Sequence, residues 1–227
     1  MRVVFLGYGS MAEVLAVRLA KMEGVEVVIA GRSPEKAQAL AAKVGDGAKH
    51  AATMSGAVAD ADAVVIATTH HAVFDAVASA GGAEAFTGKV VLDINNPVPG
   101  AYDGDFSLGG YEVDGDAGAS LCEAVQAALP GAHVVKAFNT CQAKVWRREP
   151  LEYDGRPLVV PVCGDDAGAK RTVSGWVEAM GGQAIDFGGA KAARRVEALA
   201  ALTIQLLFGG RDPETVFQLI QPEQKPV

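Results

Sequence analysis

The chain has few cysteines, and it has no long uninterrupted apolar segment. Its three cysteines, Cys122, Cys141 and Cys163, lie far apart and form no Cys-x-x-Cys pair, which argues against disulfides and zinc. No stretch approaches the ~18 apolar residues that a membrane-spanning helix needs. The apolar run that follows Arg2 ends at Gly7, which is too short for a signal peptide. We therefore expect a cytoplasmic protein that does not contact a membrane.

Positive charge is also scarce. The chain has 20 Lys and Arg residues against 27 Asp and Glu residues, which gives a formal net charge of −7. An acidic surface repels phosphate backbones, so we expect no nucleic-acid partner. A small anionic ligand is still compatible with this charge, because a local cluster of N–H groups and one arginine can outweigh it.

The chain is rich in small and β-branched apolar residues. Half of its 227 residues are apolar, whereas only 6% are aromatic. Such a core suits helices packed closely on a parallel sheet, whose buried strands are nearly continuous runs of Val, Ile and Leu.

Apolar runs of strand length alternate with helical patterns along the chain. They predict strands at residues 3–6, 25–30, 63–67, 90–92, 134–138, 158–163 and 183–186, and helices at 11–21, 34–44, 119–129, 166–180 and 190–208. This alternation implies right-handed crossovers and a doubly wound, mostly parallel α/β sheet. We expect one large domain over residues 1–150 and a smaller C-terminal α/β part over residues 151–227.

Two segments leave alternatives open. Residues 95–119 are rich in Gly, Asp, Pro and Tyr and show neither period, and a loop of this length is usually functional or disordered. The last predicted helix carries an apolar stripe that either packs on the protein's own sheet or forms a dimer interface. The stripe consists of Val196, Leu199, Thr203, Leu206 and Leu207, with Ala200 and Ile204 alongside.

The first predicted strand is followed by the motif Gly7-Tyr8-Gly9-Ser10-Met11-Ala12, which reads G-x-G-x-x-A and opens a helix. Gly7 allows a tight turn, Gly9 lets the backbone approach a pyrophosphate, and Ala12 lets the helix pack close to the strand. The helix N-terminus then directs free N–H groups at the phosphates. The motif predicts a Rossmann-like dinucleotide site.

The end of the second strand indicates which dinucleotide binds. NAD sites carry an acidic residue there, whereas this strand ends in Gly31 and Arg32. Arg32 offers a planar, permanently charged fork for a 2′-phosphate, and Ser33 and Lys36 follow within reach. We therefore predict NADP(H) as the cofactor.

Three further strand tips end in polar or special residues, and ligands of doubly wound sheets bind at such tips. These tips contribute Thr68, Thr69, His70 and His71, then Asn95, Asn96 and Pro97, and finally Ala137 and Asn139. His70 and His71 are candidates for proton transfer and Asn139 for positioning, whereas adjacent histidines form a poor metal pair and no metal site is expected. Lys136 lies inside a strand pattern and receives no role.

Taken together, these residues resemble the NADP oxidoreductase family typified by NADPH:deazaflavin (coenzyme F420) oxidoreductase, whose dinucleotide domain also occurs in ferric reductases of the STEAP type. The resemblance runs from Met1 to about Phe208. It is carried by residues 7–12, the Arg32-x-x-x-Lys36 spacing, and residues 90–97, 135–140 and 160–166, followed by Ala193-Arg194 and Glu197.

The resemblance implies that Arg32 and Lys36 bind the 2′-phosphate and that residues 8–11 bind the pyrophosphate. It places residues 68–70, residues 95–97 and Ala137 beside the nicotinamide, and it implies a homodimer. Where deazaflavin reductases tend to carry Pro-Trp, this chain has Thr69-His70.

Three functions follow as hypotheses. The first is hydride transfer between NADP(H) and a deazaflavin, which needs little beyond ring positioning. The second is reduction of a small molecule with a C=N, C=O or C=C bond, for which His70 or His71 would donate the proton. The third, of another class, is a non-catalytic NADP-binding sensor or subunit.

Overall fold

The structure is a computed structural model that describes residues 1–45, 47–212 and 214. Its strands are β1 (Arg2–Leu6), β2 (Glu26–Ala30), β3 (Ala48–His50), β4 (Ala63–Ile66), β5 (Val90–Asp93), β6 (Tyr111–Val113), β7 (Asp116–Ala119), β8 (His133–Lys136), β9 (Glu152–Tyr153), β10 (Arg156–Pro157), β11 (Val159–Gly164) and β12 (Gln183–Gly188). Its α-helices are α1 (Ser10–Ala20), α2 (Pro34–Val44), α3 (Met54–Ala59), α4 (Val73–Ser79), α5 (Leu121–Ala128), α6 (Ala143–Trp146), α7 (Ala167–Ala179) and α8 (Ala193–Phe208).

A central sheet joins the strands in the order β12-β11-β8-β5-β4-β1-β2-β3. Every neighbouring pair in it is parallel except β8 and β11, which run antiparallel. The predicted doubly wound, mostly parallel α/β fold is therefore confirmed. β11 and β12 extend the same sheet, and the division of the chain at residue 150 stays a prediction.

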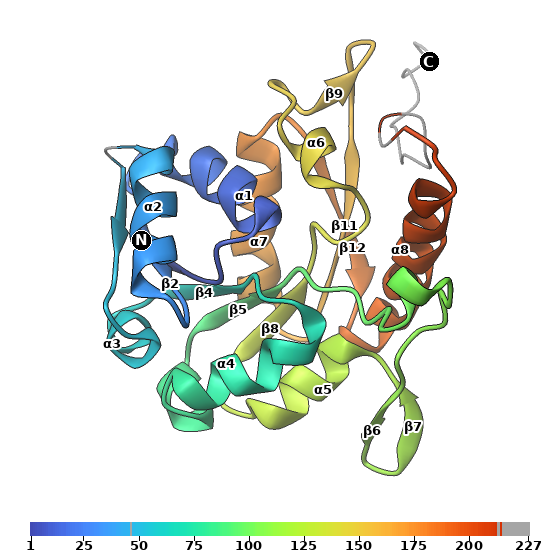
Figure 1. Cartoon of the computed structure of the whole chain (residues 1–227), viewed down its shortest axis with the longest axis horizontal. Coiled ribbons are helices and arrows are strands. Elements are labelled where there is room, and N and C mark those ends of the chain that lie inside the picture. Colours follow the sequence, from blue (N-terminus) through green and yellow to red (C-terminus); the bar gives the residue numbers. More distant parts are fainter. Residues whose placement is uncertain (46, 213, 215–227) are drawn as a thin grey trace.

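The strands alternate their side chains between two apolar layers. In β1, Val3 and Phe5 belong to the core under α1, α2 and α7, whereas Val4 and Leu6 belong to the core over α3, α4 and α5. Figure 1 shows these two helical layers above and below the sheet. Because both faces are covered, the free space for ligands lies at the carboxyl edge of the strands.

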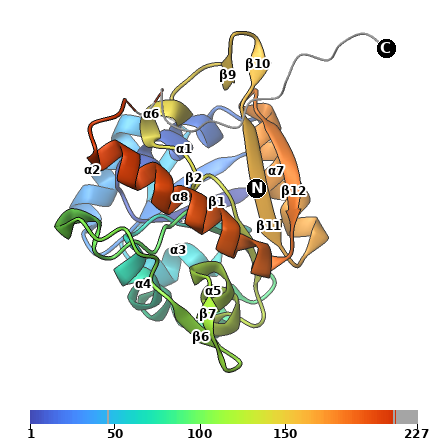
Figure 2. The ribbon, with the colours of Figure 1, turned by 90° about the vertical axis from the view of Figure 1, so that its right-hand side faces the viewer.

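Helix α8 crosses this carboxyl edge, as Figure 2 shows. On its inner side Val196, Ala200 and Thr203 are buried, so this part of the predicted stripe packs on the protein's own chain. Farther along, Leu202 is 49% exposed and Phe208 is 52% exposed. Within the predicted stripe, Leu199, Ile204, Leu206 and Leu207 are partly exposed, and the alternative that the stripe forms a dimer interface is not tested by the structure.

Residues 95–119, predicted as an irregular loop, contain regular structure. A short 3-10 turn, η3 (Ala101–Asp103), is followed by the hairpin of β6 and β7, which projects from the body of the molecule (Figure 1). The segment is attached to α8, because the ring of Phe106 packs edge-on against that of Phe208 with 5.7 Å between centroids. The hairpin was missed because β6 is only three residues long and β7 has no apolar alternation, although the Asp114-Gly115 pair at the turn, with both residues at positive φ, is a hairpin signal.

A buried ion cluster of Asp93, Lys136 and Glu197 ties the sheet to α8. The Lys136 ammonium lies 2.8 Å from Asp93 Oδ2 and 2.8 Å from Glu197 Oε1, and it donates to the Asn95 carbonyl at 2.5 Å. Lys136 and Asp93 are completely buried, and Glu197 is 2% exposed. Lys136, to which the sequence analysis assigned no role, therefore joins β5, β8 and α8.

Both carboxylates of this cluster have further donors. Asp93 Oδ1 accepts from the backbone N–H and the side-chain amide of Asn95, and Glu197 accepts from the backbone N–H groups of Leu121 and Cys122 at the start of α5. Burial works to lower the pKa of Lys136, but the two carboxylates outweigh it and raise that pKa above its ordinary value. Burial raises the pKa of Glu197, against the opposing effect of Lys136.

We expect Lys136→Met to lower the free energy of unfolding by about 3–5 kcal/mol at pH 8, because it leaves two buried carboxylates without their cation. Without the cation, the folded-state pKa of Glu197, which burial already raises, would lie further above its unfolded value. The free energy of unfolding that the variant has lost is therefore recovered as the pH falls through the folded-state pKa. The deficit of the variant relative to wild type shrinks toward pH 5. Denaturant unfolding at several pH values measures this.

The matched control is Lys43→Met, since Lys43 is exposed and pairs only with Glu13 among the described contacts. It should change stability by no more than ~1 kcal/mol at any of these pH values. Equal effects of the two substitutions would contradict a structural role for the cluster.

Candidate functional site

The loop between β1 and α1 has the geometry of a phosphate cradle. Gly7 adopts φ +127°, and a Cβ there would collide with the carbonyl of Ala67. Gly9 is the N-cap of α1 and provides no side chain to cap it, and a Cβ on Gly9 would meet no atom within 4 Å. The space over Gly9 is therefore open and the first N–H groups of α1 have no side-chain cap, as an anion site at a helix N-terminus requires.

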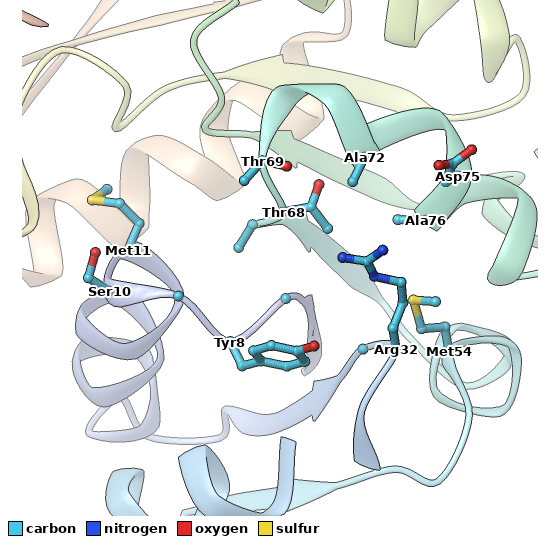
Figure 3. A pocket seen from close by; sticks show the side chains of 14 residues that line it. Tyr8, Ser10, Met11, Arg32, Met54, Thr68, Thr69, Ala72, Asp75 and Ala76 are labelled. Carbon is cyan, nitrogen blue, oxygen red and sulfur yellow. The ribbon is translucent and has the colours of Figure 1, made fainter. Parts of the chain in front are cut away.

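The end of β2 carries cationic side chains around a tyrosine ring. Tyr8 lies so close over Gly31 that a Cβ at Gly31 would be 2.6 Å from the ring, so a larger residue there would displace the ring. The Lys36 ammonium lies 5.8 Å from the centroid of the same ring. Arg32 is exposed and has no ion-pair partner within the described residues. Its guanidinium extends from the β2 end toward α4 (Figure 3).

Ser33 is engaged differently from the sequence-based expectation. Its hydroxyl donates to the Glu35 carboxylate at 2.8 Å and accepts from the Lys36 N–H at 3.3 Å, which caps α2. The Ser33 hydroxyl lowers the pKa of Glu35, which is fully exposed. The hydroxyl hydrogen of Ser33 is thus committed to a carboxylate, and a phosphate contact by this hydroxyl would require Glu35 to turn away.

A cavity of about 380 Å³, called here the Arg32 cavity, runs from this end of β2 along the phosphate cradle to β4. Tyr8 lies along one wall and Thr68 faces it from the other (Figure 3). Its lining residues are Gly7, Tyr8, Gly9, Ser10, Met11, Gly31, Arg32, Met54, Ala67, Thr68, Thr69, Ala72, Asp75 and Ala76.

Two further cavities adjoin this one at the carboxyl edge of the sheet. The His70 cavity, about 360 Å³, shares Ala67, Thr68, Thr69 and Met11 with the Arg32 cavity. Its other lining residues are His70, His71, Ile94, Asn95, Asn96, Val98, Pro99, Ala101, Ile204 and Phe208.

The Asn139 cavity, about 320 Å³, begins at Ser10 and Met11. It is completed by Asn96, Asn139, Thr140, Cys141, Gln142, Ala143, Ala200, Thr203, Ile204 and Leu207. Met11 lines all three cavities, so they meet above the start of α1.

The two adjacent histidines lie in a 3-10 turn, η1 (His70–Ala72), and their ring centroids are 3.7 Å apart. On an α-helix adjacent side chains point about 100° apart, but in this turn both line the His70 cavity. His70 Nε2 is buried and has no hydrogen-bond partner among the described residues. Burial, with a smaller contribution from His71, lowers the pKa of His70 and favours the neutral ring.

The structure brings together most of the predicted site residues. Tyr8, Ser10, Met11, Gly31 and Arg32 line the Arg32 cavity, and Thr68, Thr69, His70, Asn95, Asn96 and Asn139 line it or the two adjoining cavities. Five predicted residues line none of them, namely Ala12, Ser33, Lys36, Pro97 and Ala137. Their roles, like those of the others, stay predictions.

Two contributions to the site were missed. Asp75 and Met54 line the Arg32 cavity from α4 and α3, which the sequence analysis left unassigned. Ile204, Leu207 and Thr203 were assigned to packing or a dimer interface, whereas here they wall the Asn139 cavity. An apolar helical stripe carries no signal that distinguishes a cavity wall from a core.

The residues present fit a dinucleotide phosphate. The open space over Gly9, the uncapped α1 and the unpaired Arg32 provide for an extended anion. Thr68 Oγ1 is buried without a partner among the described residues, which marks a polar contact that a ligand can complete. In the described part of the chain, no three His, Cys, Asp or Glu residues are grouped to hold a metal.

Comparisons with known proteins agree with this geometry. Residues 2–97 match the family model described as NADP oxidoreductase, coenzyme F420-dependent. The crystal structure of a protein from Arthrobacter sp. FB24, described as an F420-dependent NADP-reductase, is 30% identical with a TM-score of 0.75, and the match covers 91% of this chain and 93% of that one. A hypothetical protein from Sinorhizobium meliloti is 24% identical with a TM-score of 0.67, covering 85% and 87% of the two chains.

The metalloreductase STEAP3 of Rattus norvegicus is 29% identical over 198 residues. That match covers 87% of this chain but only 36% of STEAP3, so this chain spans about a third of the length of that relative. None of the helices in the described residues has the length and apolar content to cross a membrane.

The fold and the site define an NADP-dependent oxidoreductase. More particularly, the chain belongs to the family of coenzyme F420-dependent NADP oxidoreductases. The resemblance on which the sequence analysis relied is thereby confirmed, and the hypothesis of a non-catalytic sensor loses its support.

The two cradle glycines should respond differently to the same substitution. Gly7→Ala places a Cβ against the backbone carbonyl of Ala67, at a residue with a left-handed φ. This substitution should lower the free energy of unfolding by at least roughly 1–3 kcal/mol. Gly9→Ala meets no atom and should unfold like wild type, but its methyl group occupies the space over the α1 N-terminus. We expect it to weaken NADPH binding by about tenfold or more, or ~1.4 kcal/mol.

Thermal unfolding and an NADPH titration on both variants provide the measurement. Wild-type affinity in the folded Gly9→Ala protein would show that phosphate binds elsewhere.

Proposed function

We propose that the protein transfers a hydride between NADP(H) and an organic acceptor, with a deazaflavin as the first candidate. The observation that carries the proposal is that the Arg32 cavity shares lining residues with two further cavities at the carboxyl edge of the sheet. One ligand of dinucleotide length can bind from Arg32 across the start of α1, and space for a second ligand remains beneath α8.

In this arrangement each part of the chain has a defined task. Arg32 and Lys36 would hold the 2′-phosphate, and the N–H groups at the start of α1 would hold the pyrophosphate. Residues 68–70, together with Asn95 and Asn96, would flank the nicotinamide, which supplies or accepts the hydride when bound. The apolar surface of α8 would exclude water from the transfer.

The deazaflavin proposal rests on the relative from Arthrobacter, which is described as an F420-dependent NADP-reductase. Hydride transfer between two rings asks the protein mainly to hold them at a near-attack distance of about 3–3.5 Å. The apolar walls from Val98, Pro99, Ala101 and Ile204 suit a flat ring.

A second candidate function is reduction of a C=N, C=O or C=C bond. The buried, unpartnered Nε2 of His70 favours it, because such an acceptor needs a proton as well as a hydride. The lowered pKa of His70 keeps the imidazolium rare at neutral pH. A rate that depends on this acid would therefore rise as the pH falls.

We also propose that the protein works as a homodimer in the cytoplasm. The exposed Leu202 and Phe208 on α8 support an apolar contact between copies. The buried thiols of Cys122 and Cys163, which form no disulfide, suit a reducing compartment.

Arg32→Ala tests the cofactor assignment. Removing the guanidinium should weaken NADPH binding by about 1.5–3 kcal/mol, the value of a hydrogen bond to a charged group, and should leave NADH binding unchanged. Titration of both dinucleotides measures this. Arg171→Ala on α7 is the control, because Arg171 lines none of the three cavities. Equal affinity of the wild type for NADPH and NADH would refute the 2′-phosphate site.

His70→Phe separates the two acceptor classes. With an imine or carbonyl acceptor, losing the proton donor should lower kcat by about 10²–10⁴-fold, whereas with a deazaflavin kcat should change little. The measurement is steady-state oxidation of NADPH with each acceptor, and the deazaflavin reaction is the internal control. An unchanged kcat with every acceptor would exclude His70 as the acid.

A further inference from the structure

Asn139, three residues after the end of β8, holds a hydrogen-bond acceptor that the fold leaves unused. The residue is 4% exposed and lines the Asn139 cavity, and its Oδ1 has no hydrogen-bond partner among the described residues. A buried acceptor without a donor is unfavourable, so such atoms in native proteins usually mark an absent ligand or water.

The orientation of this amide is determined by its neighbours. Asn139 Nδ2 donates to Asn96 Oδ1 at 2.9 Å and lies 3.4 Å from the Val196 carbonyl oxygen. Asn96 Nδ2 in turn donates to the backbone carbonyl of Asn139 at 2.7 Å. Exchanging the oxygen and nitrogen of Asn139 would place Oδ1 against two acceptors. The unpartnered atom is therefore the oxygen, and what it lacks is an N–H or O–H donor.

The backbone at this position is also held in place. Phe138, the residue before Asn139, has φ +59°, a left-handed conformation that is rare for a phenylalanine. Its ring is 1% exposed and packs edge-on against Trp146 with 5.1 Å between centroids. The core thus stabilises a turn that the local sequence disfavours, and strained positions of this kind gather at binding sites.

We propose that Asn139 Oδ1 accepts a hydrogen bond from the carboxamide N–H of the nicotinamide of bound NADP(H). This inference rests on the proposed function. The Asn139 cavity begins at Ser10 and Met11, which also line the Arg32 cavity, so a dinucleotide with its 2′-phosphate at Arg32 can reach it across the start of α1. Asn96, which the proposed function places beside the nicotinamide, lines both the Asn139 and His70 cavities and is hydrogen-bonded to Asn139, so Asn139 lies next to the proposed nicotinamide position. On the nicotinamide ring, the carboxamide is the group that bears N–H donors.

The cavity can adapt to an entering ring. Met11 and Gln142 line it with rotatable side chains, while Asn96 and the Phe138 turn keep the acceptor in place. Asn139 is then a binding residue that selects one orientation of the nicotinamide ring about its glycosidic bond. That orientation decides which face of the ring is presented toward α8.

The test compares ligands that differ only in this donor. NADP⁺ carries the carboxamide, the 3-acetylpyridine analogue replaces its NH₂ by CH₃, the thionicotinamide analogue keeps the NH₂, and 2′,5′-ADP lacks the nicotinamide altogether. Calorimetric titration of each is made on wild type, Asn139→Ala and Gln142→Ala. Gln142→Ala is the matched control, because it removes an amide from the same cavity.

We expect the wild type to bind NADP⁺ and the thionicotinamide analogue about tenfold more tightly than the acetylpyridine analogue, as one hydrogen bond to a buried acceptor allows. Asn139→Ala should reduce this ratio to within about twofold and leave 2′,5′-ADP binding unchanged, whereas Gln142→Ala should keep the wild-type ratio. Unchanged 2′,5′-ADP binding also shows that the variant is folded.

Equal binding of NADP⁺ and the acetylpyridine analogue by the wild type would overturn the proposal without any variant. A tenfold ratio that survives in Asn139→Ala would overturn it too, because the carboxamide would be recognised elsewhere. Failure of the wild type to bind 2′,5′-ADP would instead refute the proposed function, so the two failures are distinguishable.

Discussion

The buried ammonium of Lys136 is the interaction on which the geometry of the site depends. It lies between a carboxylate from β5 and one from α8 and also binds the Asn95 carbonyl, so a single cation ties two strand tips to the helix above them. A protein in which well-packed apolar side chains replace such an ion cluster is often as stable as the original, or more stable. We therefore explain the cluster by the residues that it positions rather than by a contribution to the free energy of unfolding. It fixes Asn95, and through Glu197 it fixes α8, at the edges of the two cavities that adjoin the phosphate cradle.

The cations Lys136 and Arg32 lie in opposite environments, one buried and fully paired and the other exposed and unpaired among the described residues. Lys136 has every donor engaged by the protein and none left for a ligand, whereas Arg32 is exposed and pairs with no carboxylate of the described chain. An exposed, unpaired cation loses little solvation when a phosphate arrives, and a saturated buried cation cannot rearrange at all. In the proposed function, the acidic chain would therefore bind an anion at Arg32, while the Lys136 cluster keeps its own surroundings rigid.

Local signals were sufficient for the parts of the fold that short-range physics determines. Pro34 at N1 and Ser33 as N-cap predict α2 with the bounds that the structure shows, and the glycine pattern after β1 predicts the cradle. β3 and the β6–β7 hairpin were missed, because the strands concerned are only three or four residues long and Ala48–His50 and β7 have no apolar alternation. Lys136 could not be interpreted, since its partners are distant in sequence and a lysine inside a strand pattern carries no local sign of being paired.

The same limit applies to the site, and it has a physical reason. The site residues at the strand tips could be predicted, because parallel strands end at the same edge of a sheet whatever packs above them. The residues of α8 that line the two adjoining cavities could not be predicted, because their position depends on how that helix crosses the edge. Ala200, Thr203 and Leu207 have the spacing of a core stripe, yet all three line the Asn139 cavity, although Ala200 and Thr203 are also buried. The crossing of α8 is held by Glu197, which lies about one turn before this stretch and binds Lys136 and the start of α5. Hydride transfer asks a protein chiefly for ring placement, and in the proposed function that placement would depend on this ion cluster through Asn95 and α8, which it holds.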